Sequence, residues 1–168
     1  LSVLDNVLIG LGASSTGNFR KALFSRSFLK KELSAEIDQA LELLGVFSRS
    51  MRDSCFRTVS DLPPGERRKL EICRALVSDP AVLLLDEPAA GMDPEETLEL
   101  MEDIRKIGVL KKGIGIILIE HDMSIVRKIA EEVIVLSYGK IISTGSFAEV
   151  ASDPLVQEAY LGNARNPS

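Results

Sequence analysis

Residues 81–85 restrict the possible folds of this chain more than any other segment. They read Ala-Val-Leu-Leu-Leu, an unbroken apolar run that follows a Ser-Asp-Pro break and ends at Asp86 and Glu87. Such a run is typical of a strand covered on both faces, as in a parallel sheet. Residues 114–119 form a second run of this kind, and helical segments separate the two. Strands and helices that alternate in this way predict a layered α/β core.

Apolar side chains recur at helical spacing in several other segments, and polar stretches separate them. The expected helices cover residues 1–10, 34–46, 66–77, 94–104, 123–131, 147–151 and 154–161, and the expected irregular segments cover 11–30 and 47–61. Ser34 is the expected N-cap of the second helix. Asp93, followed by Pro94 and two glutamates, predicts a well-capped helix start. The pair Tyr138-Gly139 predicts the turn of a β-hairpin.

Length, charge and cysteine content exclude some classes of function. The 168 residues fit one domain, and the formal net charge of −5 argues against nucleic acid as a partner. No apolar run is long enough for a bilayer span. Cys55 and Cys73 follow no metal-binding spacing, and His121 is the only histidine. The opening at Leu1 reads as the middle of a longer sequence.

Acidic and histidine side chains follow the two apolar runs, where ligands of open α/β sheets bind. A carboxylate at Asp86 would hold Mg²⁺ at nucleotide phosphates, and Glu87 would orient or deprotonate an attacking water. The alternative for this pair is an exposed acidic turn. His121 would polarise a γ-phosphate, and its alternative is a histidine without a role.

Three motifs, by their order and spacing, resemble those of ABC transporter ATP-binding subunits. They are GERRKLEICRAL at 65–76, LLLDEPAAGMDP at 83–94 and IEHDM at 119–123. The likeness is greatest to the branched-chain amino acid uptake branch, on residues 87–91, 120–123 and 159–162. It covers the chain from Leu1 to Gly162.

The resemblance implies a partial P-loop NTPase core, with a helical subdomain and a mostly parallel sheet flanked by helices. Residues 1–78 would be the helical subdomain, incomplete at its N-terminal side, and 79–168 the C-terminal part of the α/β core. The implied function is ATP binding and hydrolysis that energise an importer of branched-chain or other amino acids. ATP and Mg²⁺ are the implied cofactors. The implied partners are a second ATP-binding subunit and permease subunits, at the cytoplasmic face of the cell membrane.

Site roles follow from the same resemblance, residue by residue. Asp86 is similar to the Walker B metal carboxylate and Glu87 to the general base that activates water. His121 resembles the switch histidine. Gly91-Met92-Asp93 resembles the D-loop, in which Asp93 would face the opposite subunit.

The signature loop departs from the family pattern. In place of Leu-Ser-Gly-Gly-Gln, the chain has Leu62, Pro63, Pro64, Gly65 and Glu66. This loop surrounds the γ-phosphate of the opposite nucleotide with a hydroxyl and backbone N–H groups. Neither proline has an N–H or a hydroxyl, so only Gly65 and Glu66 keep backbone donors. We expect this loop to bind ATP more weakly than a standard one.

No Walker A motif occurs in the 168 residues. Residues 12–17 have its glycine spacing, but Asn18 and Phe19 follow where Lys and Ser/Thr are needed, so we interpret them as a flexible loop. The Walker A and glutamine loops would lie upstream of Leu1. The chain alone is therefore predicted to be inactive, with apolar strand faces exposed and a tendency to aggregate.

Two further interpretations of the sequence stay open. One is an ABC ATPase outside transport, of the chromosome-maintenance or translation-factor kind. Such proteins carry long heptad arms or a second cassette, which these residues lack. The other is a catalytically impaired or structural remnant of an ABC ATPase, which Pro63 and Pro64 favour.

Overall fold

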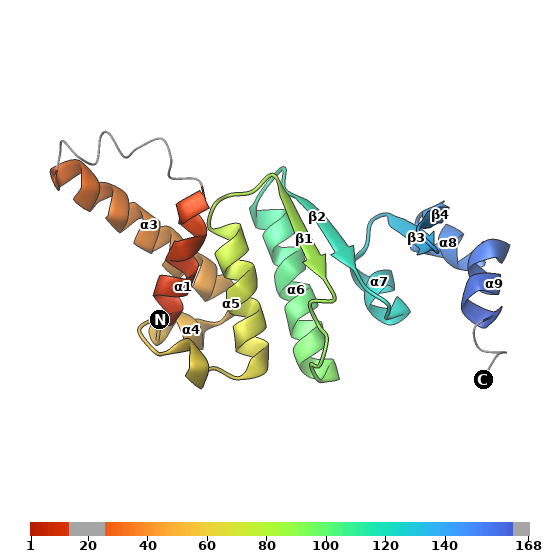
Figure 1. Cartoon of the computed structure of the whole chain (residues 1–168), viewed down its shortest axis with the longest axis horizontal. Coiled ribbons are helices and arrows are strands. Elements are labelled where there is room, and N and C mark those ends of the chain that lie inside the picture. The colour runs from red at the N-terminus through yellow and green to blue at the C-terminus, as the bar shows by residue number, and fades with distance from the viewer. Residues whose placement is uncertain (14–25, 163–168) are drawn as a thin grey trace. The chain divides into compact units, whose positions relative to one another are not determined.

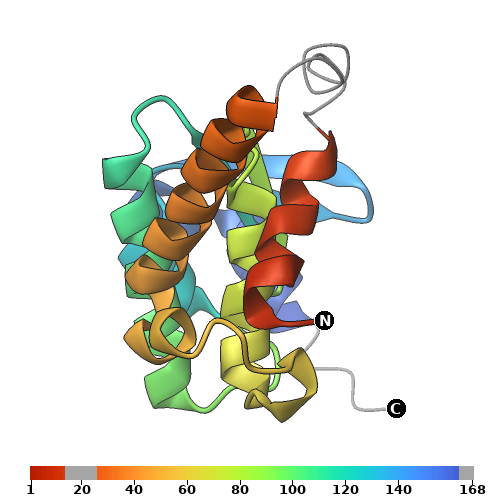
Figure 2. The ribbon, with the colours of Figure 1, turned by 90° about the vertical axis from the view of Figure 1, so that its left-hand side faces the viewer.

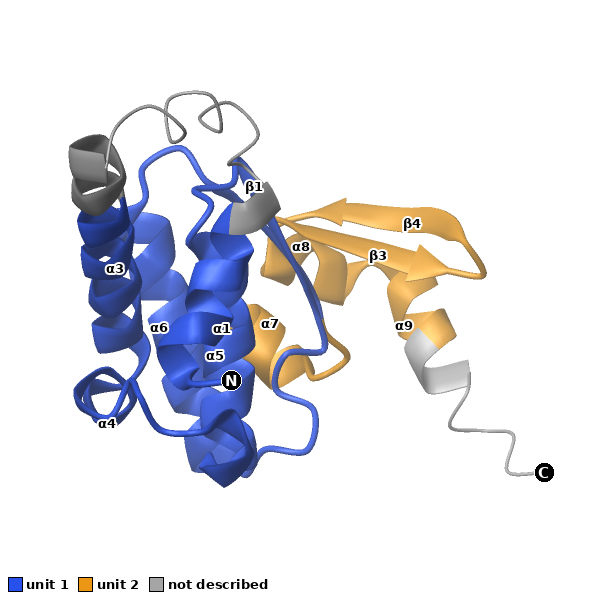
Figure 3. Cartoon of the chain, turned by 60° about the vertical axis from the view of Figure 1, so that its left-hand side comes forward, with its two compact units in different colours: residues 1–119 blue, residues 120–168 orange. Residues whose placement is uncertain are grey.

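The structure of the chain, a computed structural model, describes residues 1–13 and 26–162, with side chains at 1–11 and 33–159. These residues group into two compact units, residues 1–119 and 120–168 (Figure 3). Each unit is described by itself. The division into residues 1–78 and 79–168 that the sequence predicts is a different one and stays a prediction.

The N-terminal part of the first unit is helical. Its elements are α1 (Val3–Ile9), η1 (Gly10–Ala13), α3 (Arg26–Phe47), α4 (Arg49–Asp53), η3 (Val59–Asp61) and α5 (Pro64–Leu76). Helices α1 and α3 lie on either side of α5 (Figure 2). Their shared core consists of fully or almost fully buried apolar side chains, including Val3, Val7, Ala40, Leu44, Met51, Cys73 and Leu76. Burial of these side chains is the main driving force for packing α1 and α3 on α5.

Two sequence expectations in this part were wrong, and a third is not tested. Helix α3 begins at Arg26, so Ser34 lies inside the helix and is not its N-cap. Lys, Glu and Leu at 29–33 have high helix propensity, which extends the helix beyond its apolar stripe. Residues 47–61 are not wholly irregular, because Ser48 caps α4 by accepting a hydrogen bond from the Met51 N–H. Most of the glycine-spaced segment 12–17 lies outside the described residues.

The α/β part of the first unit consists of two parallel strands and one crossover helix. Strand β1 (Val82–Asp86) pairs with β2 (Gly115–Ile119), in a register that places Leu84 opposite Ile117 and Asp86 opposite Ile119. Helix α6 (Pro94–Leu110) connects them (Figure 1). It covers the face of the sheet on which Leu83 and Leu85 are buried, and a β-carbon at Gly108 would lie 3.6 Å from Ile116 Cδ1.

The opposite face of this two-stranded sheet is exposed and apolar. Val82, Leu84, Ile117 and Ile119 expose 52%, 70%, 56% and 58% of their surface. The prediction of a strand covered on both faces is therefore wrong for these residues. The expectation that the apolar strand faces would be exposed is confirmed.

The second unit contains a hairpin and three helices. Its elements are α7 (Met123–Ile129), β3 (Val133–Ser137), β4 (Lys140–Gly145), α8 (Phe147–Ser152) and α9 (Pro154–Gly162). Strands β3 and β4 are antiparallel, as predicted, with an irregularity after Val135. Tyr138 and Gly139 have φ of 47° and 75°, which a two-residue hairpin turn of the primed type requires. Among the described residues, no helix is both long and apolar enough to cross a bilayer.

Gly10 lies where the end of α1 closely approaches helix α5. A β-carbon at this position would lie 2.0 Å from the carbonyl oxygen of Arg74 in α5. We expect Gly10→Ala to lower the free energy of unfolding by about 1–3 kcal/mol, because the helices must move apart. Gly108→Ala is the matched control: its β-carbon meets only Ile116 Cδ1, at 3.6 Å. It should stabilise α6 by about 0.5–1 kcal/mol. Urea unfolding of both variants measures the difference, and equal effects would contradict the close approach.

A second prediction follows from the exposed apolar face of the two-stranded sheet. Leu84→Thr should raise the concentration at which the chain aggregates, since it removes an exposed apolar side chain and keeps strand propensity. Leu85→Thr, which alters a side chain only 8% exposed, should instead lower the free energy of unfolding by about 2–3 kcal/mol. Light scattering and urea unfolding report the two effects. If both variants were equally destabilised, the face of Leu84 would be covered in solution.

Candidate functional site

The first candidate element is the start of helix α5. Pro63 is its N-cap residue, makes no side-chain capping hydrogen bond, and precedes Pro64 at the first helical position. The Arg67 N–H donates to the Pro63 carbonyl at 3.0 Å. Both prolines are exposed, whereas Gly65 is buried and Glu66 half-buried. The turn thus places a rigid, donor-poor segment in front of the helix.

Side chains of α5 itself hold this segment in place. The Arg67 guanidinium donates to the carbonyl of Leu62 and to that of Ser60, both at 2.9 Å. The Glu66 carboxylate accepts a hydrogen bond from the Ser48 hydroxyl at 3.1 Å, which ties α5 to the start of α4. Arg67 was not among the site residues predicted from the sequence. The only sequence signal for Arg67 is its position. It is a basic residue one helical turn after the two prolines, in a turn whose backbone carbonyl oxygens need hydrogen-bond donors.

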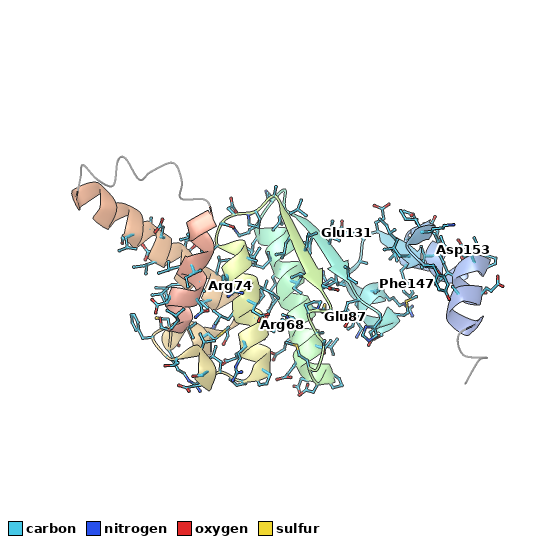
Figure 4. The ribbon with its side chains drawn as sticks, in the orientation of Figure 1. Arg68, Arg74, Glu87, Glu131, Phe147 and Asp153 are labelled. Carbon is cyan, nitrogen blue, oxygen red and sulfur yellow. The ribbon has the colours of Figure 1, made fainter. Side chains whose placement is uncertain are left out.

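The second element is the carboxyl end of β1. Asp86 is the last strand residue, and both Asp86 and Glu87 are exposed. Glu87 has φ of 41°, in the left-handed region that residues with side chains rarely adopt. Its N–H donates to the Ile119 carbonyl at 3.0 Å, and its own carbonyl accepts from the Ala90 N–H at 3.1 Å. These bonds hold Glu87 in a sharp turn directly after the strand (Figure 4), and such strained positions are common at functional sites.

The third element is the start of α6. Asp93 caps it as predicted: one carboxylate oxygen accepts from the N–H groups of Glu95 and Glu96, at 2.8 and 2.9 Å. The Glu96 carboxylate in turn accepts from the Asp93 N–H at 3.3 Å, which completes a capping box. Asp93 is exposed, so its cap does not hide it from a binding partner.

These three elements lie at one end of the first unit. A β-carbon at Gly65 would lie 3.0 Å from the Glu96 carboxylate, so the starts of α5 and α6 are in contact. The chain enters α6 from Asp86 and Glu87 through residues 88–93, in which Pro88 and Ala89 are buried. Figure 1 shows β1 running toward the end of the unit at which both helices begin, with a loop continuing from it to the start of α6. The structure therefore brings the proline loop at residues 62–65 and the Asp93 cap together, whereas Asp86 and Glu87 are joined to this cap through the intervening chain.

His121 belongs to the second unit and is exposed. It follows Ile119, the last residue of β2, by two positions. Its neighbour Asp122 caps α7, and hydrogen bonds from the side chain and backbone of Ser124 lower the pKa of the Asp122 carboxyl. Glu120, which the sequence analysis did not select, has one buried carboxylate oxygen with no hydrogen-bond partner among the described residues.

The carboxylate oxygens at this site suit a metal ion that takes most of its ligands from another molecule. Within residues 1–13 and 26–162, no group of three or more His, Cys, Asp or Glu side chains could hold a metal ion by itself. The exposed carboxylates of Asp86 and Glu87 are oxygen donors, and Mg²⁺ commonly binds one or two carboxylates, waters and substrate phosphates. The residues present therefore fit Mg²⁺ that arrives with a phosphorylated ligand.

Sequence comparisons identify two family matches. The profile described as "ABC transporter" matches residues 2–90. The profile described as "Branched-chain amino acid ATP-binding cassette transporter" matches residues 140–165. The two matches lie in different units of the structure.

Curated relatives match nearly the whole chain. The high-affinity branched-chain amino acid transport ATP-binding protein LivG of Salmonella typhimurium is 36% identical over 168 residues, covering 98% of this chain and 63% of LivG. The protein BraF of Pseudomonas aeruginosa, with the same descriptive name, is 30% identical over 164 residues, with the same coverage. The chain thus spans less than two thirds of the length of these relatives.

Solved structures show the same likeness. One is the ADP conformation of an ATP-binding cassette of an ABC transporter, with a TM-score of 0.75 and 27% identity over 96% of this chain and 63% of that one. A nucleotide-free ATP-binding cassette has a TM-score of 0.73 and 27% identity, over 95% and 62%. The predicted fold, a partial ATPase core of this type, is confirmed.

Proposed function

Because the chain belongs to the ABC transporter family, we propose that it forms part of an ATP-binding subunit that hydrolyses ATP to energise import. The observation that carries this proposal is the turn after β1. There a carboxylate that ends the strand, Asp86, precedes a second carboxylate held in a strained backbone, Glu87. Branched-chain or other amino acids are the proposed solutes, supported by the match at residues 140–165 and by the names of LivG and BraF.

The side chains of this turn have separate proposed roles. Asp86 would hold Mg²⁺, directly or through water, and the ion would neutralise charge on the nucleotide phosphates. Glu87 would accept a proton from the attacking water, since an exposed carboxylate beside the phosphate site is suited to general-base catalysis. His121 would donate a hydrogen bond to the terminal phosphate.

The starts of α5 and α6 would serve a second ATP-binding subunit. Gly65 and Glu66 would donate backbone N–H groups to the phosphate bound by that subunit, and Pro63 and Pro64 would shape the loop around it. Asp93 would face the same subunit from the start of α6. Permease subunits at the cytoplasmic face of the membrane complete the proposed assembly.

One observation favours a second candidate function. The two prolines leave α5 without a side-chain cap and without two of the N–H groups that a phosphate would need. A subunit that binds a catalytically competent partner, while its own loop contributes little to hydrolysis, is therefore the alternative.

A chimera tests the role of Glu87. This chain replaces the matching 63% of LivG from Salmonella typhimurium, and the relative supplies the remainder. Glu87→Gln should keep ATP binding and lower the hydrolysis rate by about 100-fold or more, because the proton acceptor is lost. Phosphate release and nucleotide binding measure the two effects.

Glu95→Gln provides the matched control, since Glu95 is exposed in the first turn of α6 and contributes only its backbone N–H to the cap. It should hydrolyse ATP like the parent chimera. The 168-residue chain, measured beside the chimera, should bind ATP more weakly. Unchanged hydrolysis in Glu87→Gln would show that another group activates the water.

The same chimera tests the proline loop. Pro63→Ser with Pro64→Gly should raise the hydrolysis rate, because it restores two N–H donors and a hydroxyl at the start of α5. Pro94→Ser controls for loss of a rigid first helical residue, since Pro94 occupies that position in α6, and it should not raise the rate. An unchanged or lower rate in the double variant would contradict a signature loop weakened by the two prolines.

A further inference from the structure

The interface between α5 and α6 buries two charged side chains that the proposed chemistry does not use. Lys69 and Asp103 are 9% and 6% exposed. The Lys69 ammonium lies 3.4 Å from one carboxylate oxygen of Asp103 and 3.0 Å from the Glu99 carboxylate. The other oxygen of Asp103 lies 2.9 Å from the Lys106 ammonium. Asp103 is therefore bound to a lysine on the facing helix and to a lysine on its own.

Contacts along this interface show that the two helices run parallel. Gly65 meets Glu96, and one turn later Lys69 meets Glu99 and Asp103. One helical turn further along, burial raises the pKa of the Cys73 thiol to about 12, and the negative charge of Asp103 adds to this increase. Residue numbers thus rise together on both helices. Their N-terminal ends lie at the same end of the unit.

A buried ion pair fixes the axial position of a helix in a way that apolar contacts do not. Hydrophobic burial is non-directional, so one apolar surface can slide along another at little cost. Sliding α5 by a single residue would move Lys69 by about 1.5 Å along the axis and leave Asp103 imperfectly paired in a buried place. The pair therefore penalises every register except the observed one.

The surroundings of the pair support a positional role. Glu99 and Lys106 keep their charged ends in solvent, at 66% and 56% exposure, beside an open hollow of about 400 Å³ that Lys69 and Asp103 also line. The raised pKa of Cys73 keeps its thiol neutral, so no second negative charge develops next to Asp103. The two lysines Lys69 and Lys106 thus pair with the two carboxylates Glu99 and Asp103.

We propose that Lys69 and Asp103 are positioning residues that fix the register of α5 against α6. They thereby hold the proline loop at residues 62–65 and the Asp93 cap at the same level along the axes of the two parallel helices. The consequence rests on the proposed function: both loops would face the second ATP-binding subunit, and the ion pair would present them as one rigid surface. The register itself does not depend on nucleotide.

The test replaces the pair by apolar residues. Lys69→Met with Asp103→Leu should leave the melting temperature unchanged or higher, because well-packed apolar residues replace buried ion pairs at little cost. Amide hydrogen exchange in the nucleotide-free chain should nevertheless accelerate about tenfold at the N–H groups of Glu95, Glu96 and Arg67. Amides at 104–107, in the middle of α6, should not change.

Lys106→Met is the matched control, since it removes the lysine that binds Asp103 within α6 and leaves the contact between the helices. Exchange at both helix starts should then equal that of the parent. If the double variant did not fold, the isosteric Asp103→Asn should still give accelerated exchange at these amides.

Parental exchange rates at both helix starts in the double variant would overturn the proposal, because apolar packing alone would then set the register. This measurement is separate from hydrolysis by the chimera. Unchanged hydrolysis in Glu87→Gln together with accelerated exchange in the double variant would reject the proposed role of Glu87 and keep the positioning role. Slower hydrolysis in Glu87→Gln together with parental exchange rates in the double variant would keep the proposed role of Glu87 and reject the positioning role.

Discussion

The first unit depends on the packing of α5 against α6 in parallel orientation. Helix α6 is the crossover between β1 and β2, so its position on the sheet is set by the parallel pairing of the two strands. Helix α5 packs on the helices α1 and α3 through a core that includes Cys73 and Leu76. Because the two helices begin at the same end, one interface brings together residues that lie far apart in the sequence.

This arrangement explains why the candidate site has exposed functional groups on a rigid support. Asp86, Glu87 and Asp93 are exposed, yet each follows or begins an element with one buried apolar face, on which Leu83 and Leu85 of β1 and Leu100 and Ile104 of α6 lie. Hydrogen bonds fix the turns themselves, as in the bond from the Glu87 N–H to Ile119 and in the capping box of Asp93. Side chains that are held in place and open to solvent suit a site completed by a second molecule.

Local rules predicted a large part of this structure, and the failures have physical causes. Asp93 caps α6 because its short carboxylate reaches the free N–H groups of the first turn, which needs no tertiary information. Tyr138 and Gly139 form the turn for a similarly local reason. Helix α3 was predicted to start too late, because its first turns carry helix-forming residues without an apolar stripe. Burial of β1 was mispredicted, because an apolar run does not reveal how many layers cover it.

The sequence by itself determined the family and the order of the motifs, because residue identity and spacing at 65–76, 83–94 and 119–123 suffice for both. It also determined the caps and turns, which are short-range interactions. The tertiary structure alone decided that Gly65 contacts Glu96, that Lys69 pairs with Asp103 across a buried interface, and that Leu84 remains exposed. Each of these depends on which surfaces meet in space, and contacts between residues about 30 positions apart leave no periodic signal in the sequence.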